Sequence, residues 1–432
     1  MRIVKVNKDS IANILSDLLK RSPTNYGDFQ DKVDAIIKNV RDNGDKAVFD
    51  YTAQFDKAEI NAENILVTEE EIKEAYEEVD DELIKVIRKA IKNIRDFHEK
   101  QIQKSWFETR EDGVMLGQKV TPMETCGVYV PGGKAVYPSS VLMNIVPAHV
   151  AGVKNIIMTT PPGKDGKVTA NTLVAAKEAG ATKVYKVGGA QAIAAMAFGT
   201  ESIPKVDKIV GPGNIFVALA KKAVYGNVSI DSIAGPSEIL VLADETANPR
   251  YVAADLLSQA EHDEMASAIL VTTSEELAHK VSDEIDGFLN QLSRKEIMEK
   301  SLDSFGYILV ASDMKEAIDT ANAIASEHME IMTANPFDVM TRIKNAGAIF
   351  IGAYSCEPLG DYFAGPNHVL PTNGTAKFFS PLSVDDFLKK SSIISYSREA
   401  LKEVHKDIEK FAESEHLTAH ANSIRVRFEQ ED

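Results

Sequence analysis

The stretch TKVYKVGGAQAIAAMAFGT, residues 182–200, decides the fold class because its composition changes in the middle. A short run of β-forming residues leads into two glycines, and an alanine-rich helical run follows them. The stretch VDKIVGPGNIFVALAKKAV, residues 206–224, repeats this plan of strand, glycine turn and helix. Repeated strand–helix units predict a parallel sheet that is covered by helices.

The same alternation extends in both directions along the chain. Residues 153–163 predict a buried strand that ends in a turn, and residues 169–181 predict a helix that stops at a glycine. A second block of alternating strands and helices begins near residue 237 and continues to about residue 355. Before and after these blocks, residues 28–56, 81–101 and 397–430 have the spacing of solvated helices, with Gly44 as a break in the first of them.

The bulk composition is that of a globular protein. A length of 432 residues suggests two to three domains, and the formal net charge of −17 argues against a nucleic-acid partner. The sequence has no continuous apolar run of the length that spans a membrane, and no secretory signal at its start, so we expect no membrane association and a cytoplasmic location. Two cysteines, Cys126 and Cys356, cannot form a disulfide framework, and we expect each to be a buried, inert thiol rather than a nucleophile.

Asp361 and His368 lie in an unusual stretch, GDYFAGPNHVLPT, residues 360–372. Its glycines and prolines predict that neither a helix nor a central strand runs through it. A carboxylate and an imidazole are therefore expected in a stiff loop.

A metal site is one interpretation of LLSQAEHDEM, residues 256–265. On a helix, Gln259 and His262 are one turn apart and share a face, so an amide oxygen and an imidazole nitrogen could bind a divalent ion. Asp361 and His420 are candidates to complete the site, and such a mixed set suits zinc or a similar first-row metal. The alternative is a polar helix end in water.

Glu327 and His328, in the stretch AIASEHME, are candidate general bases at the end of a predicted helix. A polar helix terminus explains this stretch about as well. Three glycine-rich turns, at residues 128–140, 187–200 and 208–218, have geometry that suits a phosphate, although glycine is common in any strand–helix turn. The G-x-G-x-x-G fingerprint is missing, so a classical dinucleotide site is not supported.

Taken together, eight separated motifs resemble one family, histidinol dehydrogenase, from roughly residue 25 to the end. They are VPGG, GGAQAIAA, DKIVGPGN, AGPSEIL, SQAEHD, SEH, GDYFAGPNHVLPT and the E-x-x-x-x-H of EHLTAH. The family oxidises L-histidinol to L-histidine through the aldehyde, in a four-electron reaction with two NAD+ and one Zn2+ per active site.

The resemblance implies a role for each matching residue. The implied zinc ligands are Gln259, His262, Asp361 and His420. The implied catalytic acid/base pair is Glu327 and His328. The implied contacts of the substrate L-histidinol are the four zinc ligands, His328, Ser237, His368 and Glu415. The implied NAD+ contacts are Tyr129, Gln191 and Asn214.

The family's fold is α/β, with two incomplete Rossmann-like domains and smaller terminal parts. It implies a helical N-terminal segment (1–110), a first Rossmann-like domain on the NAD side (111–235), a second on the zinc and substrate side (236–380) and a helical C-terminal tail (381–432). The family is an intertwined homodimer whose tail reaches the partner's active site. One departure is His416, which stands where the family commonly has glycine.

Three rival functions remain open from the sequence alone. A metal-dependent hydrolase would use Glu327 to activate a zinc-bound water, but it leaves the glycine turns unused. A non-catalytic protein with a structural metal is a second alternative. A relative that oxidises another amino alcohol or a sulfonated diol is a third.

Overall fold

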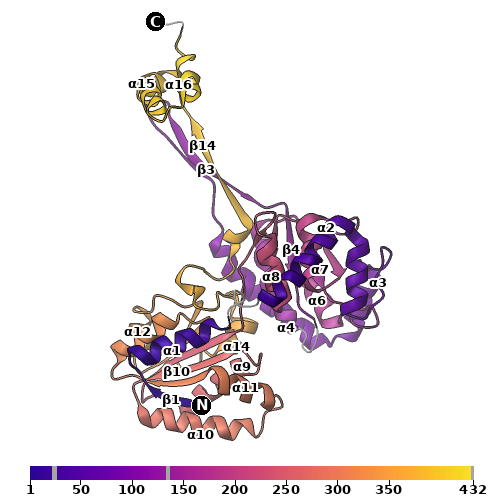
Figure 1. The fold of residues 1–432 in the computed structure, drawn as a ribbon, viewed down its shortest axis with the longest axis vertical. Helices are drawn as coiled ribbons and strands as arrows, with labels where there is room; N and C mark the ends of the chain where they lie inside the picture. Colours follow the sequence, from indigo (N-terminus) through magenta and orange to yellow (C-terminus); the bar gives the residue numbers. More distant parts are fainter. Residues whose placement is uncertain (22–26, 133–136, 430–432) are drawn as a thin grey trace. The chain divides into compact units, whose positions relative to one another are not determined.

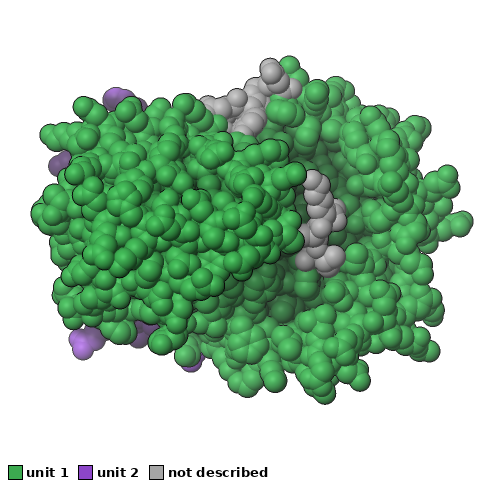
Figure 2. All heavy atoms as spheres, turned by 90° about the horizontal axis from the view of Figure 1, so that it is seen from below, with its two compact units in different colours: residues 1–101, 123–387 green, residues 102–122, 388–432 purple. Residues whose placement is uncertain are grey.

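The computed structural model describes residues 1–21, 27–132 and 137–429. These residues form two compact units, which Figure 2 colours separately. The first unit contains residues 1–101 and 123–387, and the second contains residues 102–122 and 388–432. Both parallel sheets of the protein lie in the first unit, which confirms the expected α/β class.

One of these sheets has five parallel strands in the order β6-β5-β4-β7-β8. The chain enters at the central strand, moves outward through two strands, and then returns to the other side of the centre. This is the doubly wound order without its sixth strand, and the order reverses between β4 and β7. The strands are β4 (Thr125–Tyr129), β5 (Asn155–Thr160), β6 (Lys183–Lys186), β7 (Lys208–Val210) and β8 (Ser229–Ile230).

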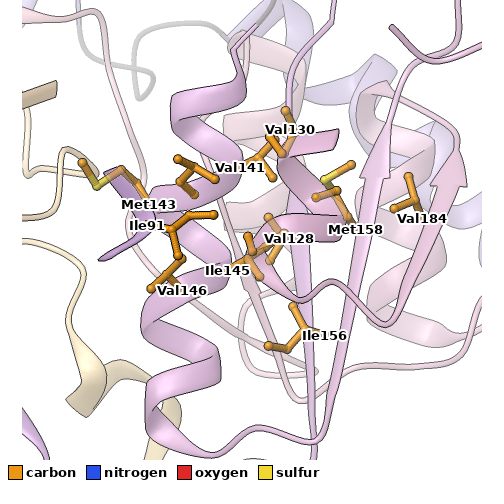
Figure 3. Packing of buried hydrophobic residues seen from close by; sticks show 14 of the residues in the cluster. Ile91, Val128, Val130, Val141, Met143, Ile145, Val146, Ile156, Met158 and Val184 are labelled. Carbon is orange, nitrogen blue, oxygen red and sulfur yellow. The ribbon is translucent and has the colours of Figure 1, made fainter. Parts of the chain in front are cut away.

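Helices cover both faces of this sheet, because successive side chains of a strand point to opposite faces. On one face, Val128 and Met158 pack against Val141 and Ile145 of the helix between their strands, as Figure 3 shows. The helices of this face are α3 (Glu69–Glu78), α4 (Asp81–His98), α5 (Pro138–Ala151) and α6 (Ala170–Ala179). Those of the other face are α2 (Gly27–Phe55), α7 (Gly189–Phe198) and α8 (Ile215–Val224).

The second parallel sheet has six strands in the order β1-β11-β10-β9-β12-β13. From β9 onward it repeats the winding of the first sheet, so the prediction of two incomplete Rossmann-like domains is confirmed. Its strands are β1 (Arg2–Lys5), β9 (Glu238–Ala243), β10 (Ser267–Thr272), β11 (Gly306–Val310), β12 (His328–Met332) and β13 (Ala348–Ile351).

Alternate residues of the central strand β9 again face two helical layers. Ile239 and Val241 face one layer, and Leu240 and Leu242 face the other. The first layer contains α9 (Pro249–Ala260), α10 (Glu275–Leu289) and α11 (Lys295–Phe305). The second contains α1 (Lys8–Leu19) and α12 (Met314–Ile324), which Figure 1 shows on one side of the sheet; the short helix α13 (Pro336–Met340) follows β12.

The N-terminal segment contains more than the expected helices. Residues Arg2–Lys5 form β1, which pairs in parallel with β11 and extends the six-stranded sheet. Ile14 and Leu18 of α1 are buried in the same core. The predicted break in the helix at Gly44 is present, because Gly44 has φ +53° there.

The second unit combines an antiparallel sheet with two helices. Its strands, in the order β14-β3-β2, are β2 (Trp106–Thr109), β3 (Met115–Pro122) and β14 (Leu388–Ser395). The expected helical tail therefore begins with a strand, and α15 (Arg398–Ser414) and α16 (Thr418–Arg425) follow it. Between these helices His416 has φ +61°, a left-handed conformation that glycine adopts more easily. Across the described residues, the helices are all too short or too polar to cross a membrane.

Candidate active site

The candidate catalytic residues gather at the amino edge of the six-stranded sheet. Ser237 directly precedes β9, and Glu327 directly precedes β12, its neighbour in the sheet. Helix α9 returns to this edge and ends at Ala260, which brings Gln259 and His262 to it. Ligands of doubly wound sheets usually bind at the opposite, carboxyl edge, so the amino-edge position is a departure from that rule.

His262, Glu357 and Asp361 form a group that could hold a metal ion. Each offers one ligand atom, and these atoms lie within 4.8 Å of one another. Gln259 is fully buried, and neither atom of its amide has a hydrogen-bond partner among the described residues. Buried amides are normally paired, so an unpaired one at this place is an observation that a bound cation would explain. Nitrogen and oxygen donors in this mixture fit zinc.

Glu357 was not identified from the sequence. It begins the short helix α14 (Glu357–Leu359), and its carboxylate accepts a hydrogen bond from the Ser258 hydroxyl at 3.1 Å. The available signal was its position four residues before Asp361, the spacing of neighbours on a helix face. That signal was weak because the stretch after Asp361 is rich in glycine and proline.

Glu327 and His328 do not end a helix, contrary to the expectation. Helix α12 stops at Ile324, because Ala325 turns the chain with φ +56°, and His328 begins β12. Glu327 Oε2 accepts a hydrogen bond from the backbone N–H of Glu238 at 2.9 Å. His328 Nδ1 lies 2.9 Å from the backbone oxygen of Glu238.

The electrostatics of this group follow from burial and from the crowding of carboxylates. Burial raises the pKa of Glu327 to about 8. Burial opposes the charged form of His328, but the carboxylates of Glu327 and Asp361 outweigh it and raise the pKa of His328 to about 10. Burial likewise opposes ionisation of Asp361, but hydrogen bonding to His328 and the charge of His368 lower the pKa of Asp361 to about 2. Perturbed groups of this kind concentrate at functional sites.

The loop that holds Asp361 and His368 departs in part from the prediction. Residues Gly360–Ala364 form a single π-helical turn, which Gly365 ends with φ +116°. Such isolated π turns are frequent at functional sites. His368 Nδ1 then lies 3.1 Å from the backbone oxygen of Asp361, and its Nε2 lies 3.4 Å from Ser140 Oγ.

A cavity of about 610 Å³ opens beside these residues. His328, Asp361 and His368 line it, together with apolar side chains that include Phe350 and Leu370. A mostly apolar cavity with a few convergent polar groups is the usual form of a small-molecule site.

The candidate cofactor residues lie at the carboxyl edge of the five-stranded sheet. Tyr129 ends β4, Gln191 lies in the first turn of α7, and Asn214 caps α8 by accepting hydrogen bonds from the N–H groups of its first turn. Tyr129 and Asn214 flank the point where the strand order reverses, which is where nucleotides bind in such sheets. The Tyr129 hydroxyl accepts a hydrogen bond from the Gly189 N–H at 3.1 Å.

Close backbone packing explains one of the glycines in these turns. A Cβ at Gly211 would lie 2.0 Å from the backbone oxygen of Tyr129.

Like Gln259, Gln191 is buried with both amide atoms unpartnered in the described part of the chain. This fits a group that hydrogen-bonds here when bound. Residues 133–136 of the first glycine turn lie outside the described residues.

The remaining candidates are Glu415, His420 and Ser237. Glu415 and His420 belong to the second unit, which is described by itself, so their approach to the other ligands stays a prediction. Ser237 lies at the amino edge of the six-stranded sheet, and its backbone oxygen accepts a hydrogen bond from the Ser267 N–H at 3.0 Å. Cys126 is buried as expected, and burial raises the pKa of its thiol, whereas Cys356 is half-buried.

Comparisons with known proteins agree on one family. Residues 19–428 match the family model described as histidinol dehydrogenase. The chain is 61% identical to histidinol dehydrogenase of Clostridium acetobutylicum over 91% of each chain. It is 59% identical to histidinol dehydrogenase of Bacillus subtilis, over 98% of this chain and 99% of the relative. The crystal structure of histidinol dehydrogenase from Elizabethkingia anophelis superimposes with a TM-score of 0.93 at 39% identity, covering 100% of this chain and 98% of that one.

Proposed function

Because the chain belongs to the histidinol dehydrogenase family, we propose that it oxidises L-histidinol to L-histidine, by way of bound L-histidinaldehyde, with two NAD+ and one Zn2+ per site. The observation that carries this proposal is that Asp361 belongs to the candidate metal group with His262 and Glu357, while its Oδ1 lies 3.4 Å from Nε2 of the buried His328 at the same cavity. An anchoring donor set beside two proton-accepting groups is what a two-step alcohol oxidation requires.

Gln259, His262 and Asp361 would hold the metal, and His420 would complete the set. Tyr129, Gln191 and Asn214 would contact the cofactor. Zinc would supply a Lewis-acid anchor for the nitrogen donors of histidinol, and NAD+ would supply the hydride acceptor. His368 and Ser237 would contact the substrate from their places at the same edge.

His328 is the proposed base of the first oxidation. A pKa of about 10 keeps the ring charged while the neighbouring carboxylates are ionised, so His328 acts as a base in the molecules whose ring is neutral. In that neutral ring, Nδ1–H donates to the Glu238 carbonyl, so the proton-accepting atom is Nε2. The ring lines the cavity, and its Nε2 lies 3.4 Å from Asp361 Oδ1. His328 therefore takes the hydroxyl proton as the carbinol carbon gives up hydride, which yields the aldehyde.

Glu327 is the proposed base of the second step. Water must add to the aldehyde, and the Glu327 carboxylate, which is ionised mainly above its raised pKa of about 8, accepts the proton that this water loses. After His328 has released the first proton to water, it takes the hydroxyl proton of the hydrate as the second hydride passes to NAD+, and the carboxylate of histidine forms. The backbone N–H of Glu238 fixes one oxygen of Glu327 and leaves the other for this proton.

A homodimer with shared sites completes the proposal. Glu415 and His420 lie in the tail unit, around the turn between α15 and α16. We assign them to the partner's active site, where Glu415 would contact histidinol and His420 would bind zinc.

Formation of NADH tests the function. Purified protein supplied with histidinol and excess NAD+ should form two NADH per histidinol consumed, measured at 340 nm, and a chelator should abolish the reaction. A metal-dependent hydrolase would form no NADH. One NADH per histidinol, with free aldehyde accumulating, would contradict the two-step oxidation at a single site.

A further inference from the structure

Arg21 is fully buried although it carries a charge. It follows the first helix, α1, and its Nη2 forms an ion pair with Glu238 Oε1, while its Nη1 donates to the backbone oxygen of Met265 at 2.9 Å. A buried guanidinium is costly unless its charge is paired, and the partner here lies 217 positions away in the sequence. Its Nε has no hydrogen-bond partner among the described residues, so the two Nη groups make the contacts. The contact therefore ties the N-terminal helix to the start of β9.

Glu238 makes several hydrogen bonds at the amino edge of the six-stranded sheet, where the proposed catalytic pair lies. Its carboxylate also accepts hydrogen bonds from the backbone N–H of Asn373 at 3.1 Å and of Glu327 at 3.4 Å. Its own backbone N–H donates to Glu327 Oε2, and its backbone oxygen faces His328 Nδ1. Both side chains of the pair are thus held by one residue, Glu238.

The reciprocal bonds between Glu238 and Glu327 place two buried carboxyl groups on neighbouring strands. Their exposed fractions are 3% and 6%, so water screens neither of them well. A nearby cation stabilises the ionised form of such groups: His328 lies beside Glu327, and Arg21 pairs with Glu238. The planar guanidinium of Arg21 also fixes the orientation of the Glu238 carboxylate, because one nitrogen binds Glu238 and the other binds the Met265 backbone oxygen.

We propose that Arg21 and Glu238 form a buried positioning pair that sets the geometry of Glu327 and His328. The proposal rests on the proposed function for the roles of Glu327 and His328, and it adds two residues that touch neither substrate nor cofactor in that scheme. Arg21 acts through Glu238, and Glu238 acts through its backbone groups. A misplacement of about 1 Å in a catalytic group can lower turnover about 10²-fold.

Enzyme kinetics supply the first test, on the full-length protein loaded with zinc. Arg21→Met should lower kcat about 10²-fold while the KM for histidinol changes less than about threefold. Arg21→Lys keeps the charge but not the planar fork, so its kcat should lie between those of the wild type and Arg21→Met. The double variant Arg21→Met/Glu238→Gln removes both charges and keeps an oxygen acceptor for the Glu327 N–H, although not for the Asn373 N–H as well, so it should regain about tenfold in kcat over Arg21→Met.

A matched control separates positioning from general stability. Lys186→Met breaks another largely buried ion pair, with Glu71, in the five-stranded sheet. It should lower the unfolding temperature but leave kcat per folded enzyme within about twofold. An equal loss of kcat in Lys186→Met would overturn the proposal, as would an unchanged kcat in Arg21→Met.

Hydrogen–deuterium exchange gives a readout that does not depend on activity. The amides of Glu238 and Glu327 are protected by each other's carboxylates, so peptides that span them should exchange faster in Arg21→Met, and peptides of α7 should not. If Arg21→Met does not fold, Arg21→Lys carries the same test. Unchanged exchange at both amides would overturn the positioning role. Absence of NADH formation by the wild type would instead refute the proposed function and leave this test standing.

Discussion

Replacement of Gln259 by methionine should have opposite effects on the metal-free and the zinc-loaded protein. Gln259 is fully buried in the last turn of α9, and both atoms of its amide lack partners among the described residues. A buried polar group without a hydrogen bond costs about 1–3 kcal/mol of folding free energy. Methionine has a similar length and no such groups. Gln259→Met should therefore stabilise the metal-free protein by about 1–3 kcal/mol.

Zinc should reverse that difference if Gln259 is a ligand. A ligand that binds only the folded state adds stability that grows with its affinity, so a site weakened about 1,000-fold by the loss of a ligand forfeits about 4.1 kcal/mol at saturating zinc, which exceeds the gain of about 1–3 kcal/mol. The assay is urea unfolding of chelator-treated protein, with and without added zinc, together with the zinc content after dialysis by elemental analysis. The variant should unfold at higher urea than the wild type without zinc and should retain less zinc.

Gln191→Met is the matched control. Gln191 is also buried, and both its amide atoms are unpartnered in the described structure, but it lies in the five-stranded sheet. Its replacement should stabilise the metal-free protein by a similar amount, leave zinc content unchanged and weaken NAD+ binding. The reasoning is refuted if Gln259→Met destabilises the chelator-treated protein, or if it retains zinc as well as Gln191→Met does.

Three further predictions concern the bases and the pH dependence of stability. His328→Asn should lower kcat about 10²–10⁴-fold with little change in KM, and near-normal turnover would remove it from the role of base. Glu327→Gln should slow oxidation of added histidinaldehyde more than oxidation of histidinol to the aldehyde, so equal damage to both half-reactions would count against its assignment. Burial raises the pKa of Asp56 from 3.8 to about 6, so the stability that its proton provides is lost as the pH rises through about 6. At pH 8 the free energy of unfolding of Asp56→Asn, measured with urea, should then exceed that of the wild type by about 1 kcal/mol, a figure reduced to allow for the partial exposure of Asp56. Equal free energies of unfolding at that pH would contradict the burial of this carboxylate.

Local sequence patterns were sufficient for most of the fold. The glycine turns at residues 187–200 and 208–218 each join a strand to a helix as predicted, because their glycines adopt backbone conformations that other residues avoid. The strand β1 was missed, since four residues carry little periodicity and their partner β11 lies about three hundred positions away. Pairing over such distances depends on tertiary packing, which no local window contains.

The candidate site divides in the same way. Residues in recognisable motifs, such as Asp361 and His262, were identified, and the structure brings their ligand atoms together. Glu357 and Arg21 were not, because their importance lies in burial beside partners from remote segments. A carboxylate or a guanidinium in a charged sequence gives no sign of being buried until the strands that enclose it are known.

Diffraction from crystals of the zinc-loaded protein with histidinol, recorded on both sides of the zinc absorption edge, tests the account most directly. The account predicts one anomalous peak per chain, bonded to Gln259, His262 and Asp361 together with His420, with the histidinol hydroxyl facing His328 Nε2. A fully active crystal whose zinc lies away from Gln259, or whose substrate lies outside the cavity lined by His328, would contradict it.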